Sequence, residues 1–416
     1  MKVSECESQD ESKVEAFRQA VESLLDESSN IIKELTESPQ FMDCVTKEDD
    51  KILTKEPCDQ NGGCQLDLIG DFEQFSITNG LKLTSKLEES QLSFVNESLE
   101  DGIKFSGSFF EGKPHGFFRI MNKYGDLVFF GCFIYGRLHG QSLKSLVGGG
   151  FLLNLDHSNS EFSGDNIVYL YPDCQTAFVG SFDQSSMVSA QANEVINTRN
   201  NCCGLNYPIF ELLNDVYYSQ DISSLDKISK EPMLADPYES FFVFVKESKI
   251  SGAGQGLFAK ISVASGTVLA FYNGIRKPSV SLSESSFEDT PYKISLSKQT
   301  DMDIPQECIS LDKYTSSLAH KVCHSFTPNC DFDKYDHPRF GVILSVVSLR
   351  EILEGEELTV DYKYDLNVAP SWYKKAWAKH QKMIRGMPSW QKALSRKRRY
   401  RRNTSSLSSN HLNKIV

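Results

Sequence analysis

Two cysteines that bracket a histidine form the most obvious chemical motif of the chain, in the segment CHSFTPNC. Cys323 and Cys330 are seven residues apart, and no second pair stands at the spacing of a zinc ribbon or a zinc finger. A cysteine–histidine nucleophile needs its base close to the thiol, whereas neighbours such as Cys323 and His324 point to opposite faces of an extended segment. The pattern therefore favours neither a metal site nor a thiolate nucleophile.

A glycine cluster, SGAGQGLF at residues 251–258, is a second candidate. In a dinucleotide-binding fingerprint such a cluster would open a helix, but the LFAKISV that follows has the pattern of a strand. Glycine does allow a ligand to approach the backbone closely. Gly252, Ala253, Gly254 and Gly256 can thus line a small-molecule site without forming a phosphate loop.

Tyrosines form the third group. Tyr272 stands in AFYNG, and Tyr362 and Tyr364 stand in EGEELTVDYKYD. Taken singly, each is explained as well by an aromatic side chain at the boundary of a core as by a binding site. Their role therefore depends on the elements that position them.

Residues 236–366 carry all three groups and predict a mainly β domain. Short apolar segments such as FFVFV, TVLAFY, VILSVV and ELTVDY alternate with turns rich in glycine, proline and serine. Regular helical patterns are missing between them, which argues against a doubly wound parallel sheet. After this domain the aromatic residues and alanines of SWYKKAWAKH have helical spacing, so a C-terminal helix is expected within residues 367–394.

An internal repeat precedes this domain. FSGSFFEGKPHG (105–116) returns 24 residues later as FFGCFIYGRLHG (129–140), with six identical positions. Alternating aromatic residues give the period of a half-buried strand, and Gly112 and Gly136 fall where a tight turn needs a positive φ. Each unit predicts a β-hairpin that buries its apolar face by stacking on its neighbours, and residues 61–192 are expected to form such an antiparallel array.

Two shorter segments, LIGDF (68–72) and FVGSF (178–182), look like worn copies of the same unit. The repeats resemble MORN repeats. His115 and His139 recur in both clear copies and are expected to be structural turn residues rather than metal ligands.

The remaining segments are polar. Residues 1–60 are acidic, with a few apolar residues at helical spacing, and predict a partly helical arm; residues 193–235 have turn composition and predict a linker. The N-terminus lacks the pattern of a signal peptide, so the eleven cysteines are expected to be thiols in a reducing compartment. No apolar run approaches the length that spans a bilayer, and no membrane partner is expected.

The net charge of −12 hides an asymmetry. From Ser371 to Val416 there are thirteen lysines and arginines and no acidic residue, whereas the preceding residues carry 44 − 13 = 31 basic and 56 acidic ones. A basic tail on an acidic body is typical of an interaction segment. The run SRKRRYRR in the tail, residues 395–416, predicts nuclear import or a nucleosome contact, against the alternative of a solvated end. The expected location is the nucleus, on the chromosome, with the cytoplasm as a second compartment.

The combination of motifs is more specific than any one of them. ISGAGQGLFAK, FYNG, AHKVCHSFTPNC and GEELTVDYKYD follow in this order over about 115 residues. Together they closely resemble the SET domain of protein-lysine methyltransferases. With MORN-like repeats in front and DPYES opening the domain at Asp236, the chain resembles the MORN-repeat SET-domain methyltransferases that act on histone H3. The resemblance covers about residues 66–377.

The resemblance implies a pseudoknotted, β-rich domain in which KVCHSFTPNC passes beneath ELTVDY. It implies no metal, and it implies S-adenosylmethionine as the cofactor, held by Gly254, Gln255, Gly256, Cys323, His324 and Trp372. It also implies a channel for a substrate lysine, lined by Tyr272, Tyr362 and Tyr364, with Tyr362 closest to the chemistry. The implied substrates are the histone H3 tail and other proteins that carry a target lysine.

Three positions depart from the family pattern. Cys323 replaces an asparagine that helps to hold the cofactor, and a thiol is a poor hydrogen-bonding group, so cofactor binding is expected to be weaker by about 1 to 3 kcal/mol. Phe332 replaces the tyrosine of monomethylating relatives, so product beyond monomethyl-lysine is expected. Tyr292 stands where relatives have an asparagine that contacts the cofactor.

The leading hypothesis is an active protein-lysine N-methyltransferase that transfers the methyl group in line to a deprotonated lysine. The alternative, based on Cys323, is a catalytically lapsed SET protein that serves as a chromatin or scaffold binding module.

Overall fold

The computed structural model describes residues 91–98, 102–111, 113–155, 162–200, 206–279 and 292–386. They fall into two compact units that divide after Tyr218. The predicted arm (1–60), the basic tail (395–416) and the worn repeat at 68–72 lie outside the described residues. Among the helices that are described, none is long and apolar enough to cross a membrane.

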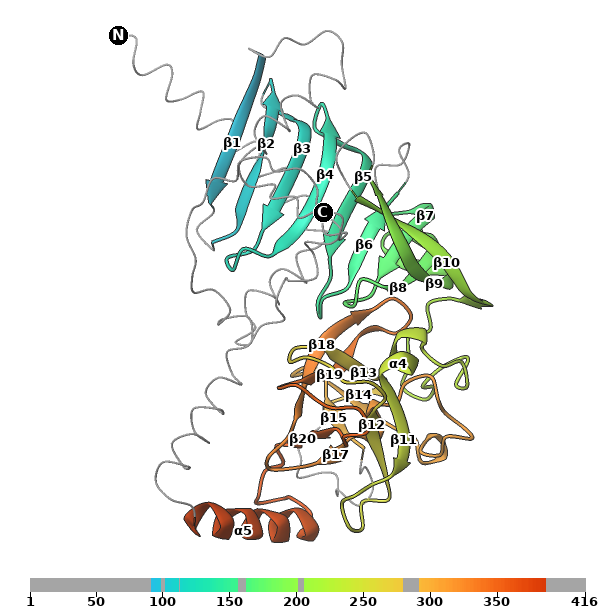
Figure 1. The fold of residues 1–416 in the computed structure, drawn as a ribbon, viewed down its shortest axis with the longest axis vertical. Helices are drawn as coiled ribbons and strands as arrows, with labels where there is room; N and C mark the ends of the chain where they lie inside the picture. Colours follow the sequence, from blue (N-terminus) through green and yellow to red (C-terminus); the bar gives the residue numbers. More distant parts are fainter. Residues whose placement is uncertain are drawn as a thin grey trace. The chain divides into compact units, whose positions relative to one another are not determined.

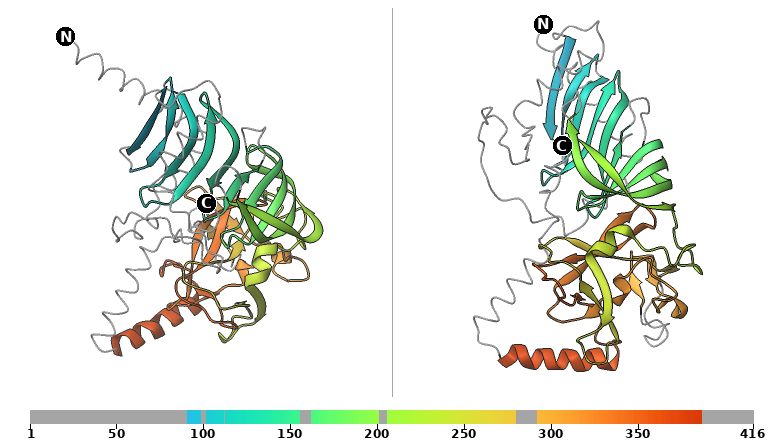
Figure 2. Two further views of the ribbon diagram at one scale, coloured as in Figure 1. Left: turned by 45° about the horizontal axis from the view of Figure 1, so that its top comes forward. Right: turned by 45° about the vertical axis from the view of Figure 1, so that its right-hand side comes forward.

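The first unit is a ten-stranded antiparallel sheet whose strands lie in chain order (Figure 1). The sheet twists along its length, as the two further views show (Figure 2). This confirms the predicted antiparallel hairpin array. The strands are β1 (Leu92–Ser98), β2 (Lys104–Phe110), β3 (Lys113–Met121), β4 (Leu127–Ile134), β5 (Arg137–Ser145), β6 (Phe151–Asn154), β7 (Gly164–Leu170), β8 (Thr176–Asp183), β9 (Ser186–Asn200) and β10 (Asn206–Tyr218).

The two clear repeats coincide with the hairpins β2–β3 and β4–β5. Tyr135 and Gly136 form the second hairpin turn with φ of +50° and +83°, the left-handed values that a two-residue turn of this kind needs. In the first hairpin Glu111 has a φ of +49°, while Gly112 lies outside the described residues. The positive φ predicted for Gly136 is therefore confirmed.

Aromatic packing explains the other repeated glycine. The ring of Phe118 lies so close to Gly107 that a Cβ atom there would come within 2.4 Å of it. Phe117 and Phe118 are neighbours in β3 but belong to two different buried clusters, because successive side chains point to opposite faces of the sheet. The repeat thus leaves space at glycine for a large ring from the adjacent strand.

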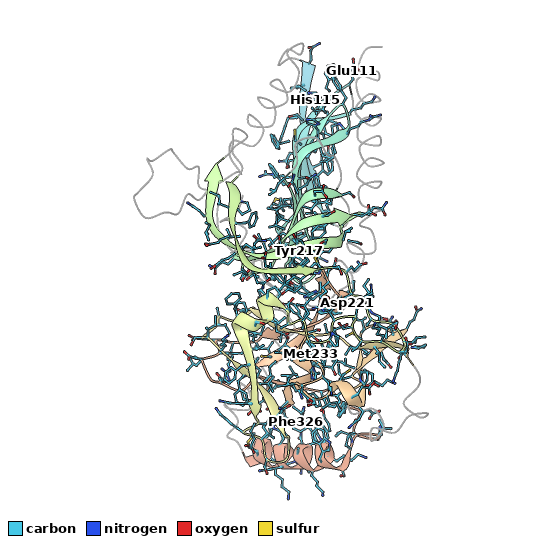
Figure 3. All side chains as sticks on the ribbon, turned by 90° about the vertical axis from the view of Figure 1, so that its right-hand side faces the viewer. Glu111, His115, Tyr217, Asp221, Met233 and Phe326 are labelled. Carbon is cyan, nitrogen blue, oxygen red and sulfur yellow. The ribbon has the colours of Figure 1, made fainter. Side chains whose placement is uncertain are left out.

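His115 has a structural role. Its side chain is buried, and its Nδ1 accepts a hydrogen bond of 3.3 Å from the backbone N–H of Tyr135, which ties the first hairpin to the second (Figure 3). The side chain of His139 is exposed, and its role stays a prediction.

The linker predicted for residues 193–235 is wrong in its first half. β9 and β10 pair with each other across this segment, so the sheet extends to Tyr218 instead of ending at residue 192. Val195 and Phe210 pack on the core, whereas Ile196 and Ile209 are exposed. A strand with one solvated face alternates polar and apolar residues, and its polar half gave this segment the composition of a loop.

The second unit consists of short strands in four small sheets, with one short and one long α-helix. The predicted β-rich domain with a C-terminal helix is confirmed. The elements are α4 (Pro237–Phe242), β11 (Val243–Glu247), β12 (Gln255–Ala259), β13 (Val268–Tyr272), β14 (Ile275–Pro278), β15 (Ile294–Ser295), β16 (Thr300–Asp303), η3 (Gln306–Cys308), η4 (Ala319–Lys321), β17 (Cys323–His324), β18 (Cys330–His337), β19 (Gly341–Ser348), β20 (Thr359–Val360) and α5 (Ser371–Gly386).

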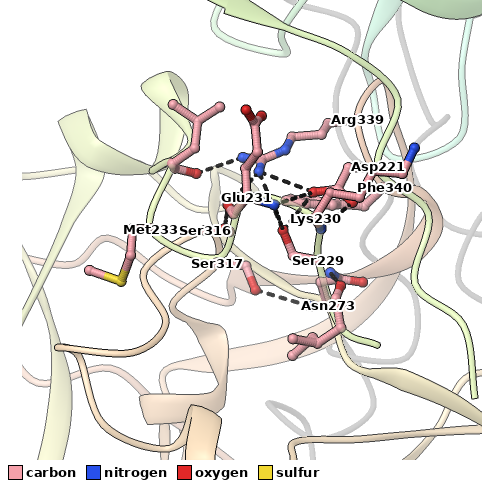
Figure 4. A network of polar contacts seen from close by, with 12 residues as sticks. Asp221, Ser229, Lys230, Glu231, Met233, Asn273, Ser316, Ser317, Arg339 and Phe340 are labelled. Carbon is pink, nitrogen blue, oxygen red and sulfur yellow. Dashed lines mark hydrogen bonds and ion pairs between the residues drawn. The ribbon is translucent and has the colours of Figure 1, made fainter. Parts of the chain in front are cut away.

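A buried polar network joins residues 219–235 to this unit (Figure 4). The guanidinium of Arg339 lies 3.3 Å from the carboxylate of Asp221 and donates hydrogen bonds of 2.6 and 2.8 Å to the carbonyl oxygens of Leu234 and Glu231. Asp221 also accepts from the backbone N–H of Lys230 at 2.7 Å. The second half of the predicted linker is therefore anchored by an almost fully buried arginine.

Candidate active site

The segments of the cysteine motif and of the tyrosine motif lie side by side. β17 and β20 form a parallel pair in which Cys323 is opposite Thr359 and His324 is opposite Val360. The N–H of Ser325 donates to the carbonyl oxygen of Val360 at 2.9 Å. This is the contact that the pseudoknot prediction required of the two segments.

Asn329 fastens the same crossing with its side chain. Its Oδ1 accepts from the N–H of Thr359 at 2.7 Å, and its Nδ2 donates to the carbonyl oxygen of Glu357 at 2.8 Å. The residue is only 3% exposed. Nearly all of its hydrogen-bonding capacity is spent on holding the segment that leads into Tyr362.

Tyr362 is held at both ends. Its N–H donates to His324 Nδ1 at 3.2 Å, and its hydroxyl donates to the carbonyl oxygen of Val322 at 2.8 Å. Burial raises the pKa of the Tyr362 phenol, so it stays protonated throughout the physiological range. Burial also lowers the pKa of His324, which therefore is neutral and accepts the hydrogen bond on Nδ1.

Tyr272 and Phe332 face each other from different strands of the sheet β13–β19–β18. Their ring centroids are 5.9 Å apart in an edge-on arrangement. The Tyr272 hydroxyl donates to the carbonyl oxygen of Tyr292 at 2.5 Å. Burial raises the pKa of Tyr272 well above its usual range, and the phenols of Tyr362 and Tyr364 add to the shift. The three predicted tyrosines are thus brought together in one cluster, in which Tyr272 is buried and Tyr362 and Tyr364 are partly buried.

Hydrogen bonds fix the backbone on both sides of Tyr272. Glu239 of α4 accepts hydrogen bonds of 2.9 Å from the N–H groups of Phe271 and Leu318, and the amide of Asn273 donates to the carbonyl oxygen of Ile228 at 2.9 Å. Asp236 begins α4 by accepting from the N–H of Glu239 at 2.9 Å. The segment DPYES therefore positions the end of β13.

Aromatic rings on the C-terminal helix border the cluster. The ring of Tyr364 lies 5.4 Å from that of Tyr362, and the indole of Trp372 lies 6.3 Å from each of them and 5.9 Å from His324. Burial raises the pKa of Tyr364 to about 12. Trp372 is 47% exposed, so one part of its face remains open to solution.

The glycine cluster divides into two roles. Gly254 has a φ of +71° and open space where a Cβ atom would stand, in keeping with a surface that a ligand can approach. At Gly256 a Cβ atom would come within 2.6 Å of the Glu357 carboxylate. That carboxylate accepts from the Ser248 hydroxyl and from the N–H of Lys249, so Gly256 is required by a packed polar contact.

Gln255 is tied to a buried lysine. Its side-chain Oε1 accepts from Lys321 Nζ at 2.7 Å, and the same ammonium group donates to the carbonyl oxygen of Ile309. Lys321 is 6% exposed, and desolvation lowers its pKa. In the described part of the chain no carboxylate forms an ion pair with Lys321, and an anionic group of a ligand would complete its coordination.

Cys323 lies in the same place with its thiol turned toward the glycine strand. The Sγ atom is 3.6 Å from the carbonyl oxygen of Gln255 and 3.6 Å from the Ser248 hydroxyl. Burial raises the pKa of the Cys323 thiol. It is a protonated, weakly bonded side chain, which is the opposite of a thiolate nucleophile. The five cysteines of the described residues are all free thiols.

Sequence reasoning missed four residues of this region: Asn329, Glu357, Lys321 and Ser248. Each is polar and packed into the junction of the motifs. Glu357 and Asn329 stood in the quoted segments GEELTVDYKYD and HSFTPNC. A charged or amide side chain inside an otherwise apolar strand segment was the available signal, because such a group needs a buried partner.

The site can therefore hold a polar small molecule with an anionic group, beside a cluster of uncharged phenols. The residues fit S-adenosylmethionine: the Lys321 ammonium suits its carboxylate, and the half-open face of Trp372 suits its adenine ring. Among the described residues no group of histidine, cysteine, aspartate and glutamate side chains is arranged to hold a metal ion.

The chain matches two known protein families. Residues 254–363 match the SET domain, and residues 133–205 match the N-terminal domain of the histone H3 K4-specific methyltransferase SET7. The second match covers strands of the hairpin sheet.

Individual proteins resemble the chain to different degrees. The histone-lysine N-methyltransferase SETD7 of Halocynthia roretzi is 39% identical over 259 residues, which cover 60% of this chain and 67% of that protein. The histone-lysine N-methyltransferase 2B of Homo sapiens is 29% identical over 118 residues, which cover 28% and 4%. A solved structure of ctPRC2 in an autoinhibited conformation bound to S-adenosylmethionine is 18% identical, with a TM-score of 0.23, and the match covers 34% of this chain and 17% of that one.

Proposed function

Because the chain belongs to the SETD7-like family of SET-domain histone-lysine N-methyltransferases, we propose that it methylates a lysine that enters the cluster of Tyr272, Tyr362 and Tyr364. The observation that carries this proposal is the gathering of three protonated phenols, one buried and two partly buried, beside Cys323, His324 and Gln255. Enzymes of this class use S-adenosylmethionine.

S-adenosylmethionine, when bound, supplies a sulfonium methyl group that an amine can attack in line. Lys321, the backbone of residues 254–256 and 323–324, and the face of Trp372 would hold it. The chemistry that it would supply is transfer of this methyl group to the lysine nitrogen, with the thioether of S-adenosylhomocysteine as the leaving group. This chain's task is to present the amine in its neutral form and in line.

The protonation state is the first barrier. For a lysine of pKa about 10.4, forming the neutral amine at pH 7 costs about 4.6 kcal/mol. A dry cluster of uncharged phenols lowers that cost because it disfavours the ammonium form. The raised pKa values of Tyr272 and Tyr362 mean that neither phenol becomes an anion that would hold the ammonium in place or take its proton.

Positioning supplies the rest. The hydroxyl of Tyr362 is committed to the carbonyl oxygen of Val322, and that of Tyr272 to the carbonyl oxygen of Tyr292. Both rings are thus fixed in angle without a bound substrate. A fixed line of attack is worth several kcal/mol of barrier.

The proposed substrates are the histone H3 tail and other proteins with an accessible lysine, and the proposed site of action is the nucleus. The family and the named relatives support histone lysine as the acceptor. The basic run at residues 395–402 supports import. Loss of nuclear accumulation on deletion of residues 396–402 is the expected result, and unchanged accumulation would contradict import by this segment.

A second candidate function rests on Cys323. Its thiol already lies against Gln255 and Ser248, and it offers a cofactor less than the amide of an asparagine would. A chain that has lost cofactor affinity altogether would serve as a chromatin or scaffold binding module.

The deciding experiment is mass spectrometry of a histone H3 tail peptide after incubation with the full chain and S-adenosylmethionine, beside Tyr362→Phe. Added methyl groups that disappear in the variant are expected. If no methyl group is added, calorimetric titration with the cofactor separates the candidates. Binding without transfer points to a different protein substrate, which a lysate of nuclear proteins with labelled cofactor would reveal. If the cofactor does not bind, the proposed enzymatic function is overturned and the binding module remains as the candidate function.

A further inference from the structure

The C-terminal helix α5 is held to the domain by one side only. Tyr373 is 4% exposed, and its ring lies 4.7 Å from that of His324. Phe326, labelled in Figure 3, contacts Trp377 and stacks on His380 at ring distances of 5.1 and 5.2 Å. These contacts define the buried side of the helix.

The opposite side is a row of exposed lysines: Lys374, Lys375, Lys379 and Lys382. At about 100° per residue they share about 140° of the helix circumference, and Arg385 falls on the same side. The helix contains no acidic residue. Within the described part of the chain, none of the ion pairs involves any of these four lysines, and Lys374 reaches only the carbonyl oxygen of Asn367 at 3.2 Å.

This arrangement opposes the stability of the helix. Lys374 stands at the end of the first turn and Lys375 directly after it, near the helix N-terminus, where the helix dipole disfavours positive charge. Lys375, Lys379 and Lys382 are spaced at i+4 and i+3, so each repels the next by a few tenths of a kcal/mol. A helix face that served only solubility would carry acidic as well as basic residues, and acidic residues are abundant in the rest of the chain. The uncompensated charge indicates an anionic partner.

We propose that the basic face of α5, formed by Lys374, Lys375, Lys379 and Lys382 with Arg385, binds the phosphate backbone of double-stranded DNA. The four lysines extend about 12 Å along the helix axis, and one strand of a duplex carries a phosphate per about 3.4 Å of its length, so about three to four phosphates of one strand can face them. Ammonium groups bind phosphates as point charges and read no sequence.

Two observations favour DNA over an anionic membrane. A basic helix that binds membranes must insert an apolar face, but here Tyr373 and Trp377 of α5 already pack against His324 and Phe326, and the large apolar side chains that stay exposed on the helix are Trp372 and Met383. A histone-lysine methyltransferase also meets its substrate next to DNA. This second argument alone rests on the proposed function. Binding by α5 itself requires neither cofactor nor catalysis.

The test measures binding of the full chain to a fluorescent duplex of random sequence by anisotropy, over a range of salt concentrations. In one variant Lys374, Lys375, Lys379 and Lys382 are replaced by glutamine. The matched control replaces four exposed lysines elsewhere, Lys104, Lys113, Lys298 and Lys313, so that both variants lose the same charge. Both keep the basic tail.

The expected result is at least a tenfold weaker affinity for the α5 variant at moderate salt, and a slope of log K against log salt that is smaller by about 3 to 4. The control should stay within about threefold of the unaltered chain. Equal losses in both variants would show that net charge matters and the α5 face does not. Unchanged binding by the α5 variant would also overturn the proposal, as would preferential binding to single-stranded RNA or to vesicles of phosphatidylserine and phosphatidylcholine.

Circular dichroism of both variants verifies the fold, and the α5 variant is expected to be at least as stable as the unaltered chain because like-charge repulsion is removed. Peptide methylation measured without DNA keeps the two proposals separate. Duplex binding without peptide methylation would support the α5 proposal by itself. Methylation without duplex binding would overturn the α5 proposal alone.

Discussion

The ammonium of Lys363 contacts both carboxylate oxygens of Asp331, at 3.0 and 3.1 Å. Lys363 stands between Tyr362 and Tyr364 with a φ of +53°, a left-handed conformation that a side chain disfavours. Asp331 precedes Phe332 on β18, an edge strand of its sheet. The ion pair therefore joins the segment that carries Tyr362 and Tyr364 to the strand that carries Phe332.

Lys363→Gly should change the free energy of unfolding by less than about 1 kcal/mol. Relief of the left-handed strain, about 1 kcal/mol, offsets the loss of an exposed ion pair worth about 0.2 to 1 kcal/mol. Asp331→Asn loses only the pair and should destabilise slightly. Urea unfolding of both variants checks this, and a loss above about 2 kcal/mol for Lys363→Gly would show that the ion pair carries far more than its exposure suggests.

Phe332→Tyr should confine the product to monomethyl-lysine. The ring of Phe332 faces Tyr272 at 5.9 Å, and an added hydroxyl would occupy the space that a methylated amine needs. Mass spectrometry of a peptide at long reaction times with excess cofactor is the measurement, with the unaltered chain expected to reach dimethyl-lysine or beyond. Only monomethyl product from the unaltered chain would contradict the role given to Phe332.

Gly256→Ala should weaken both stability and cofactor binding. The new Cβ atom would displace the Glu357 carboxylate and break its bonds to Ser248 and Lys249, at a cost of about 1 to 3 kcal/mol. Gly266→Ala is the matched control, because Gly266 lies outside the glycine cluster, has open space at the Cβ position and carries only the cost of its positive φ of +87°, about 1 kcal/mol. Thermal unfolding and calorimetry compare them. An equal effect of the two changes would argue against the Glu357 contact.

Asn329→Ala should destabilise the second unit by about 2 to 4 kcal/mol, because it leaves the N–H of Thr359 and the carbonyl oxygen of Glu357 buried without a partner. Asn329→Asp keeps the acceptor for Thr359 but loses the donor, so it should also destabilise. Unfolding in urea gives both values. If the alanine variant loses less than about 0.5 kcal/mol, the side chain does not fasten the crossing.

His320 should make stability depend on pH. Burial lowers its pKa from 6.5 to about 3, and the neighbouring Lys321 ammonium adds to the shift. The unfolded chain therefore binds the proton more tightly, so the free energy of unfolding falls as pH drops below 6.5, by at most about 1.4 kcal/mol per pH unit. His320→Phe should flatten the profile between pH 6.5 and 4.5. Parallel profiles for the unaltered chain and His320→Phe would sink this assignment.

Local patterns were enough to identify about half of the strands and the order of the motifs. The 24-residue repeat predicted the hairpins β2–β3 and β4–β5 because a period of two and a turn glycine are properties of neighbouring residues. The same reasoning failed at residues 193–218, where one solvated face gave two strands of the sheet a polar composition. The strands at residues 193–218 are decided by the pairing of β9 with β8 and with β10.

The site divides in the same way. The motif order indicated which residues gather, and Tyr272, Tyr362, Tyr364, Cys323 and His324 do so. The contact of Ser248 with Glu357 joins residues 109 positions apart, and it gives Gly256 a packing role that its spacing among glycines did not indicate. The thiol of Cys323 likewise received its partners only from the folded chain. Periodicity and motifs record local preference, whereas buried polar groups take their roles from the partners that tertiary packing brings to them.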